Sequence, residues 1–368
     1  MTLDLIRNAG DARRHSDFPV VIDPVEIFPK LVPSSETSSS DLVHPVSGWE
    51  IPASISKAVD SINDFNVTLT KILKKPKRAT RDDIMMITTF PIKKLRSLNG
   101  NYLTGLVACA CVALDLWDRL TELMVKGVVG NGSDLCGMLI SKNKAGLLCK
   151  YIGHVSDLRS SELTEILGFF LNPTNESFLG MIDVKKEWDE QGLDAIKSAT
   201  SPDATDLTRD IAVLLMMACD GFSPSESCLH HLFSSISMDD ILVIPSVISA
   251  LGSQELSRLL QYFRKWIEKY LRFPEATPHG NVTDKSPATV KMCKHIPTLD
   301  VVVMGLSLVL EQQYGYLVMN TEFHQELKML EGVVRPLVAK AKACCGLANA
   351  IDYLQKQKDQ SKLEFDCL

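Results

Sequence analysis

Apolar residues recur with helical spacing along most of this chain, and that periodicity limits the fold more than any other feature. From about residue 80 onward they return every three or four positions, and no comparable stretch alternates apolar and polar residues as a half-buried strand does. In the stripe at 103–124 the acidic residues lie on the opposite helical face: Asp115, Asp118 and Glu122. The pattern predicts an all-α protein built from amphipathic helices.

The second half of the chain carries the clearest helix boundaries. Asp220-Gly221 is typical of a helix end, because glycine adopts the left-handed conformation at low cost. Ser223-Pro224-Ser225-Glu226 then provides an N-cap hydroxyl, a proline at the first helical position and a glutamate that can reach back to the cap amide. Short connections imply antiparallel neighbours, and no fixed period emerges. We therefore expect an irregular array of helical hairpins that resembles an α-solenoid.

Composition divides the chain into segments. Prolines and a serine-rich tract make residues 17–53 unable to sustain a long helix, although a first helix is expected at 52–73. Periodicity weakens at 174–203, where residues 198–203 are expected to form a loop. The predicted organisation is a Pro/Ser-rich extended or partly disordered arm at 1–80, a helical domain at 81–272, a Pro-rich loop at 273–297, a C-terminal helical pair at 298–355 and a frayed tail at 356–368.

Charge and cysteine content exclude several classes of protein. The 39 Lys and Arg residues against 45 Asp and Glu give a net charge of −6, which argues against a chain that coats nucleic acid but leaves room for a local basic patch. The ten cysteines follow no disulfide framework, and the N-terminus lacks the apolar core of a signal peptide. The apolar run at 299–310 is shorter than the roughly 20 residues of a membrane span. We expect reduced thiols, no membrane and a location in the cytosol or nucleus.

Catalytic and metal motifs are weak. Cys228, His230 and His231 lie close together, but no second ligand pair completes a tetrahedral metal site, so burial in a helix core is the favoured interpretation. No nucleophile, base and orienting residue can be assembled from the sequence spacing. The sequence therefore predicts a protein that is not an enzyme, with no catalytic residues, no metal, no cofactor and no small-molecule substrate.

A basic run separates the arm from the helical domain. Pro76 lies between basic residues on both sides: Lys74, Lys75, Lys77 and Arg78. The proline is expected to keep the segment extended. Import receptors read basic side chains on extended segments of this kind, so the four residues are candidates for a nuclear import signal. A solvated linker and a patch that contacts RNA phosphates remain open as alternatives.

Two helix faces are candidates for partner contact, at 255–272 and at 322–342. The first carries an aromatic and basic end, and its candidate contact residues are Arg258, Arg264, Lys265 and Trp266.

Three blocks of the helical region carry a resemblance to a known family. They are 146–157 (GLLCKYIGHVSD), 259–266 (LLQYFRKW) and 306–318 (LSLVLEQQYGYLV). Their order and pattern resemble the helical C-terminal half of nucleolar protein eleven and its fungal counterpart, over about residues 140–350. That family belongs to the small-subunit processome. Its members usually carry a β-propeller before the helices, and this chain has no such region.

The resemblance implies a nucleolar scaffold in small-subunit ribosome biogenesis. Its helical tail would join other protein subunits of a pre-ribosomal assembly on nascent ribosomal RNA, and so support pre-rRNA transcription and processing, with at most an indirect or weak RNA contact. The family has no catalytic residues to carry over. The same helices would also suit a cytosolic adaptor in trafficking or ubiquitin transfer, and this alternative stays open.

Overall fold

The computed structural model describes residues 53–89, 101–129, 134–155, 158–236, 244–274, 276 and 288–365. Within these residues the protein is all-α, with fifteen α-helices and two 3-10 turns and no strand. This confirms the predicted fold class. The chain divides into two compact units, Met1–Ser133 and Asp134–Leu368. The boundary differs from the predicted one near residue 80, and residues 1–52 of the predicted arm lie outside the description.

Unit 1 is organised around a helix that is buried on almost every side. Its elements are α3 (Ala53–Lys74), η1 (Pro76–Arg78), α4 (Arg81–Thr89), α6 (Asn101–Ala113) and α7 (Trp117–Val125). Helix α6 packs against α3 and α7, and its residues 107–112 are all buried. Because α3 shares this core, residues 53–74 are part of a folded unit, whereas the sequence assigned them to the arm.

The stripe at 103–124 does not form a single helix. The chain leaves α6 after Ala113 and turns through Asp115, whose φ of 56° is left-handed. The Leu116 amide donates to the Cys111 carbonyl at 2.8 Å and closes the turn before α7. The one-helix expectation is therefore wrong, since a turn without glycine or proline leaves little trace in the apolar spacing.

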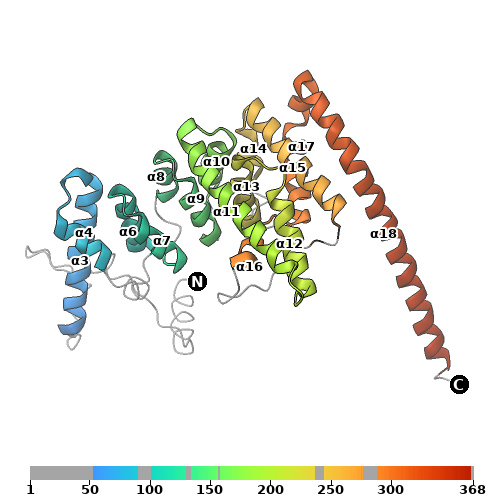
Figure 1. The fold of residues 1–368 in the computed structure, drawn as a ribbon, viewed down its shortest axis with the longest axis horizontal. Coiled ribbons are helices and arrows are strands. Elements are labelled where there is room, and N and C mark those ends of the chain that lie inside the picture. The colour runs from blue at the N-terminus through green and yellow to red at the C-terminus, as the bar shows by residue number, and fades with distance from the viewer. Residues whose placement is uncertain are drawn as a thin grey trace, which may run out of the picture. The chain divides into compact units, whose positions relative to one another are not determined.

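Unit 2 is a larger array of helices. Its elements are α8 (Leu135–Ser141), α9 (Ala145–His154), α10 (Ser160–Leu171), α11 (Asn175–Ala199), α12 (Asp206–Cys219), α13 (Pro224–Ser235), α14 (Ile244–Ser249), α15 (Ser253–Arg272), α16 (Ala288–Cys293), α17 (Leu299–Met319), η3 (Thr321–Phe323) and α18 (His324–Phe365). Helix α11 packs against α9, α12, α13 and α16, while α17 packs against α14 and α15 (Figure 1). The packing has no regular repeat.

The long helix α11 occupies most of the range 174–203, where the apolar periodicity is weak, and the loop expected at 198–203 begins after Ala199. One face is buried at four- and three-residue spacing, by Ser177, Met181, Val184, Trp188, Gly192 and Ala195. Half of these side chains are small because the neighbouring helices lie close. A Cβ atom on Gly192 would lie 2.9 Å from the Cys219 sulfur. Small residues at contact positions weaken the apolar periodicity, which explains why this helix is hard to predict from the apolar pattern.

The predicted boundary between α12 and α13 is confirmed. Gly221 has a φ of 73°, as a left-handed helix stop requires. The Ser223 hydroxyl accepts from the Glu226 amide at 3.3 Å, and the Glu226 carboxylate accepts from the Ser223 amide at 2.7 Å. These two bonds form the predicted capping box.

The C-terminal part is more helical than predicted. A short helix, α16, lies within the segment expected to be a Pro-rich loop. Helix α18 continues through Pro336 to Phe365 and so includes most of the segment at 356–368 for which the sequence predicts a frayed tail. Its last turns are rich in Lys, Gln and Glu, which favour helix, and Asp352 pairs with Lys356 at 2.8 Å.

Candidate interaction surfaces

The Cys and His residues of α13 belong to the core of unit 2. Cys228, His230 and His231 are all buried. The Nε2 atom of His230 lies 3.2 Å from the Ala218 carbonyl, and its Nδ1 atom lies 3.1 Å from the Tyr262 hydroxyl. Because a carbonyl only accepts, Nε2 carries the proton and Nδ1 accepts from the tyrosine. Among the residues that the structure describes, no group of three or more His, Cys, Asp or Glu side chains could hold a metal ion.

Aromatic rings surround His230. Its ring centroid lies 4.6 Å from that of Phe222, 5.0 Å from Trp266 and 5.3 Å from Trp188. Burial lowers the pKa of His230 to about 3, so the ring is neutral near pH 7. A neutral ring with both nitrogens engaged inside an aromatic cluster is a packing element.

A second pair of histidines lies beside this cluster. The rings of His231 and His295 lie with their centroids 4.5 Å apart and their planes tilted by 42°, and the His231 Nδ1 atom has no hydrogen-bond partner among the described residues. Burial lowers the pKa of both rings, that of His295 to about 4. A Cβ atom on Gly153 would lie 2.9 Å from the His295 ring, so this glycine allows α9 to approach the histidine closely.

The buried cysteines are poor nucleophiles. Burial raises the pKa of Cys111, Cys136 and Cys293 to about 12. The reactive thiolate form is therefore scarce at neutral pH. Cys344 and Cys345 differ, because both are exposed on α18.

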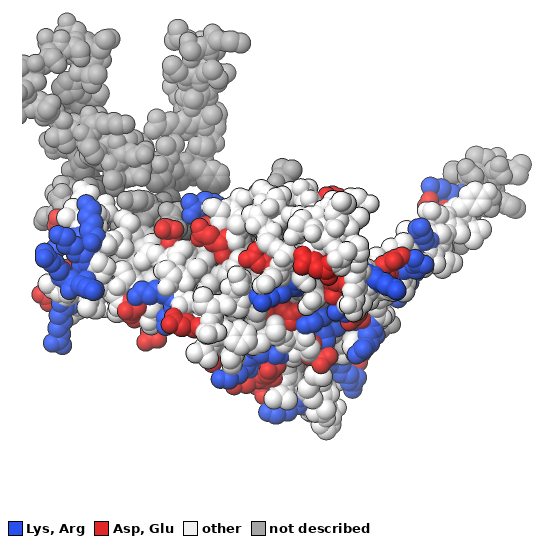
Figure 2. Space-filling view, turned by 90° about the horizontal axis from the view of Figure 1, so that it is seen from above, with Lys and Arg blue, Asp and Glu red and all other residues white. Residues whose placement is uncertain are grey.

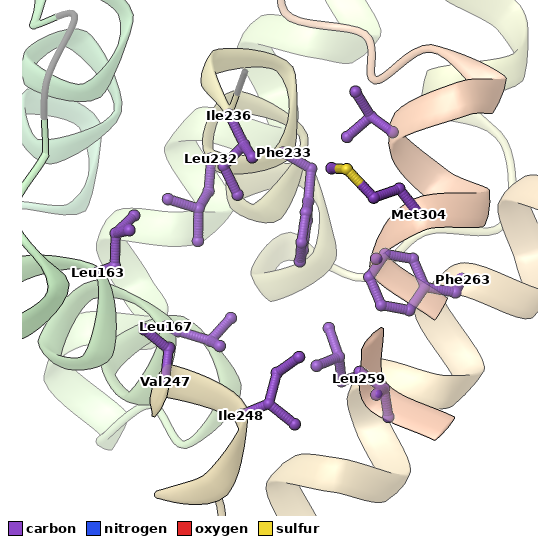
Figure 3. A pocket seen from close by; sticks show the side chains of 13 residues that line it. Leu163, Leu167, Leu232, Phe233, Ile236, Val247, Ile248, Leu259, Phe263 and Met304 are labelled. Atoms are coloured by element: carbon purple, nitrogen blue, oxygen red, sulfur yellow. The ribbon is translucent and has the colours of Figure 1, made fainter. Parts of the chain in front are cut away.

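An apolar cavity lies between α10, α13, α14, α15 and α17. Figure 3 shows aliphatic and aromatic side chains from these helices converging on it. Its volume is about 30 Å³, close to that of one water molecule. Ligand pockets of drug-sized molecules have roughly 300–1,000 Å³. The cavity is a packing gap next to Gly305, where a Cβ atom would lie 2.7 Å from the Phe263 ring.

The candidate contact residues on α15 are mostly engaged within unit 2. Trp266 is fully buried against Phe222 and His230, so the expectation that it contacts a partner is wrong. Helix α15 packs against α17, α18 and α10 and therefore buries more than one face.

The three basic candidates on α15 hold neighbouring helices. Lys265 pairs with Glu226 at 2.8 Å, and Arg264 pairs with Glu326 of α18 at 2.7 Å. Arg258 donates to the Leu171 carbonyl and also borders two open surface clefts of about 350 and 320 Å³. Of the four candidates, Arg258 alone has an exposed side chain, so α15 offers little free surface for a partner.

The basic run is folded, which differs from the extended segment that the sequence predicted. Lys74 ends α3, Pro76–Arg78 form η1, and Arg81 begins α4. The turn is closed by the Arg78 amide on the Lys75 carbonyl at 3.0 Å and by the Ala79 amide on the Pro76 carbonyl at 3.1 Å. The prediction was wrong because Pro76 occupies the first position of a helical turn, where its fixed φ and missing amide are tolerated.

We call the exposed basic residues of this turn the basic surface. They are Lys71, Lys74, Lys75, Lys77, Arg78 and Arg81. Figure 2 shows basic side chains gathered over the region of α3 and α4. None of the six forms an ion pair with another residue that the structure describes.

Helix α18 leaves the rest of unit 2 after its first turns. Phe323 of η3 and Leu330 of α18 are buried, whereas every described side chain from 338 to 356 is exposed. The exposed apolar side chains include Leu347 at 65%, Ile351 at 54% and Leu354 at 62%. Residues 343–351 include no charged side chain. We call residues 338–354 the projecting segment.

The sequence pattern did not predict a partner surface over most of this segment. It expected partner contacts at 322–342, and the first part of that range packs on α15 instead. The available signal was the absence of charge at 343–351, which is unusual for a helix surrounded by solvent.

Helix α17 is long and apolar enough to cross a membrane, by length and composition only. Within unit 2 it packs against α14 and α15, and Gly305, Leu306 and Val309 are buried. Of its most apolar stretch 28% is buried inside unit 2.

No family model, no curated protein and no solved structure matches the chain.

Proposed function

We propose that this chain is a non-catalytic helical scaffold that binds other protein subunits of a nucleolar, small-subunit pre-ribosomal assembly. The observation that carries the proposal is the projecting segment of α18. A helix that is apolar on many sides is normally buried, and exposed apolar patches mark surfaces that bind other proteins. The pre-ribosomal setting is supported by the resemblance of residues 140–350 to nucleolar protein eleven.

The chemistry of the core also supports a binding role. His230, His231 and His295 are buried with lowered pKa values, and burial raises the pKa of the Cys136 and Cys293 thiols. The apolar cavity between α10, α13, α14, α15 and α17 is the size of a water molecule. These groups stabilise a helical array whose exposed helices contact partners.

Nuclear import through Lys74, Lys75, Lys77 and Arg78 stays a prediction. An import receptor would read these side chains on an extended backbone, so the 3-10 turn would have to open first.

The test is co-purification from cells with localisation of the same tagged full-length chain. We expect it in nucleoli together with small-subunit pre-ribosomal proteins. Replacing Leu347 and Ile351 with lysine should remove these proteins. The matched control replaces Leu179 and Leu193, exposed on α11, with lysine and should retain them.

Exclusion of the intact chain from nucleoli, with no pre-ribosomal protein recovered, would contradict the proposal. Recovery of cytosolic trafficking or ubiquitin-transfer proteins would favour the adaptor role.

A further inference from the structure

The basic surface has a charge opposite to that of the rest of the chain. Six basic residues and no acidic residue lie between 71 and 81. Since the whole chain has 39 basic and 45 acidic residues, the remainder carries a net charge of −12, against +6 in this short segment. A polyanion would be repelled by the remainder and attracted to the basic surface.

The fold fixes these side chains on one piece of structure. Phe65, Leu69 and Ile72 are buried on the opposite face of α3. After the turn, the Thr80 amide donates to the Asp83 carboxylate at 2.8 Å, and the Asp83 amide donates to the Thr80 hydroxyl at 3.3 Å. Thr80 is therefore the N-cap of α4, and the carboxylate of Asp83, the second of the two acidic residues that follow the run, completes the cap. A prearranged set of charges loses less entropy on binding than a flexible run.

We propose that the basic surface binds the phosphodiester backbone of nucleic acid without reading its sequence. This inference does not rest on the scaffold role, because it uses unit 1 and a different observation. Lysine and arginine contacts to phosphates supply most of sequence-independent binding, by releasing condensed counterions. Among the described residues of 71–81 there is no aromatic side chain that could stack on a base.

Two other anionic partners fit the surface less well. A membrane-bound helix inserts an apolar face, and the apolar face of α3 is already buried within unit 1. Interfaces with proteins have an apolar centre from which charged residues are depleted. The exposed side chains of residues 71–81 are basic apart from Thr80. The exposed apolar residues Val67 and Met85 lie one helical turn before and after this run, so they do not give it an apolar centre.

The test is fluorescence anisotropy of the purified full-length chain with labelled 20-nucleotide single-stranded RNA and a 20-base-pair duplex. We expect binding that does not depend on base sequence. If all six residues contact phosphates, the slope of log affinity against log salt should reach about −4 for the single strand. Affinity should then fall by a factor on the order of 10²–10³ between 50 and 200 mM salt.

The variant replaces Lys74, Lys75, Lys77 and Arg78 with glutamine. Four lost contacts should reduce the magnitude of the slope by about 3. The matched control makes the same change in charge on unit 2, with glutamine at Lys186, Lys197, Lys340 and Lys342, which are all exposed. It should bind like the unchanged chain, and thermal unfolding of both variants checks that they fold.

Equal binding by the variant and the control would overturn the proposal. So would stronger binding to vesicles that contain phosphatidylserine, or to a polyglutamate peptide, than to either nucleic acid. Loss of co-purified proteins in the α18 experiment would leave this result unaffected, so the two proposals can fail separately.

Discussion

Three buried histidines make the stability of unit 2 depend on pH. Burial lowers the pKa of His230 to about 3 and of His295 to about 4, and it also lowers the pKa of His231. The unfolded chain takes up protons on these rings near pH 6.5, while the folded chain does not. Their contribution is therefore complete above pH 6.5 and is lost as pH falls from there toward 4.

We expect the free energy of unfolding to fall between pH 7.5 and 5.5, by up to about 1.4 kcal/mol per pH unit for each ring. Urea midpoints at the two values measure it. His231→Phe should make the pH dependence of the free energy of unfolding shallower, because it removes one of the three titrating rings. The substitution breaks no hydrogen bond of the His231 Nδ1 atom, which has no partner among the described residues. His324→Gln, on the exposed start of α18, is the control. A midpoint independent of pH would show that the rings are not buried as described.

Gly305 lies where α17 packs closely against α15. An added Cβ atom would lie 2.7 Å from the buried Phe263 ring. Gly305→Ala should therefore destabilise unit 2 by about 1–3 kcal/mol through overpacking. Gly315 lies in the same helix with nothing within 4 Å, so Gly315→Ala should stabilise it by about 0.5–1 kcal/mol. Chemical denaturation of both variants measures the two changes in the free energy of unfolding. Equal changes would contradict the close packing of α17 on Phe263.

At the scale of elements, the N-terminus of α13 is the boundary that the sequence predicted best. Ser223 caps the helix and Glu226 completes the box while also pairing with Lys265. Ser223→Ala should cost about 0.5–2 kcal/mol, whereas Ser223→Asp keeps an acceptor oxygen and should be close to neutral. Thermal or urea unfolding of the pair measures this. If both substitutions cost the same, the cap is not what stabilises the helix start.

Other elements were predicted poorly, for definite physical reasons. The helix α11 was missed because Ser177, Gly192 and Ala195 replace large apolar residues where neighbouring helices come close. The turn between α6 and α7 was missed because Asp115 takes a left-handed conformation without a glycine. Pro76 was interpreted as a helix breaker, although it starts a 3-10 turn. Local patterns report caps and large apolar stripes, but not the distance between helices.

The candidate contact residues show the same limit. All four candidates lie on the single helix α15: Arg258, Arg264, Lys265 and Trp266. Trp266 is nevertheless buried, Lys265 pairs with Glu226 of α13, and Arg264 pairs with Glu326 of α18. A sequence shows which face of a helix is polar. It does not show how many faces its neighbours cover.

At the scale of the whole molecule, the chain combines two units with separate surfaces: the basic surface of unit 1 and the projecting segment of unit 2. The projecting segment should contribute little to the stability of the free chain, because its described side chains are exposed. The Leu347→Lys, Ile351→Lys double variant should therefore change the free energy of unfolding by less than about 0.5 kcal/mol. A cost of several kcal/mol in urea unfolding would mean that this segment is buried within its own chain.

We expect another protein to cover the projecting segment in cells. Site-specific photo-crosslinking can detect that protein, with a photoreactive residue at position 347 or 351 of the full-length chain and, as controls, at 179 or 193 on α11. Crosslinks to a pre-ribosomal protein should form from α18, and none to that protein should form from α11. A chain that stays uncrosslinked at 347 and 351, while it is located in nucleoli, would contradict this expectation.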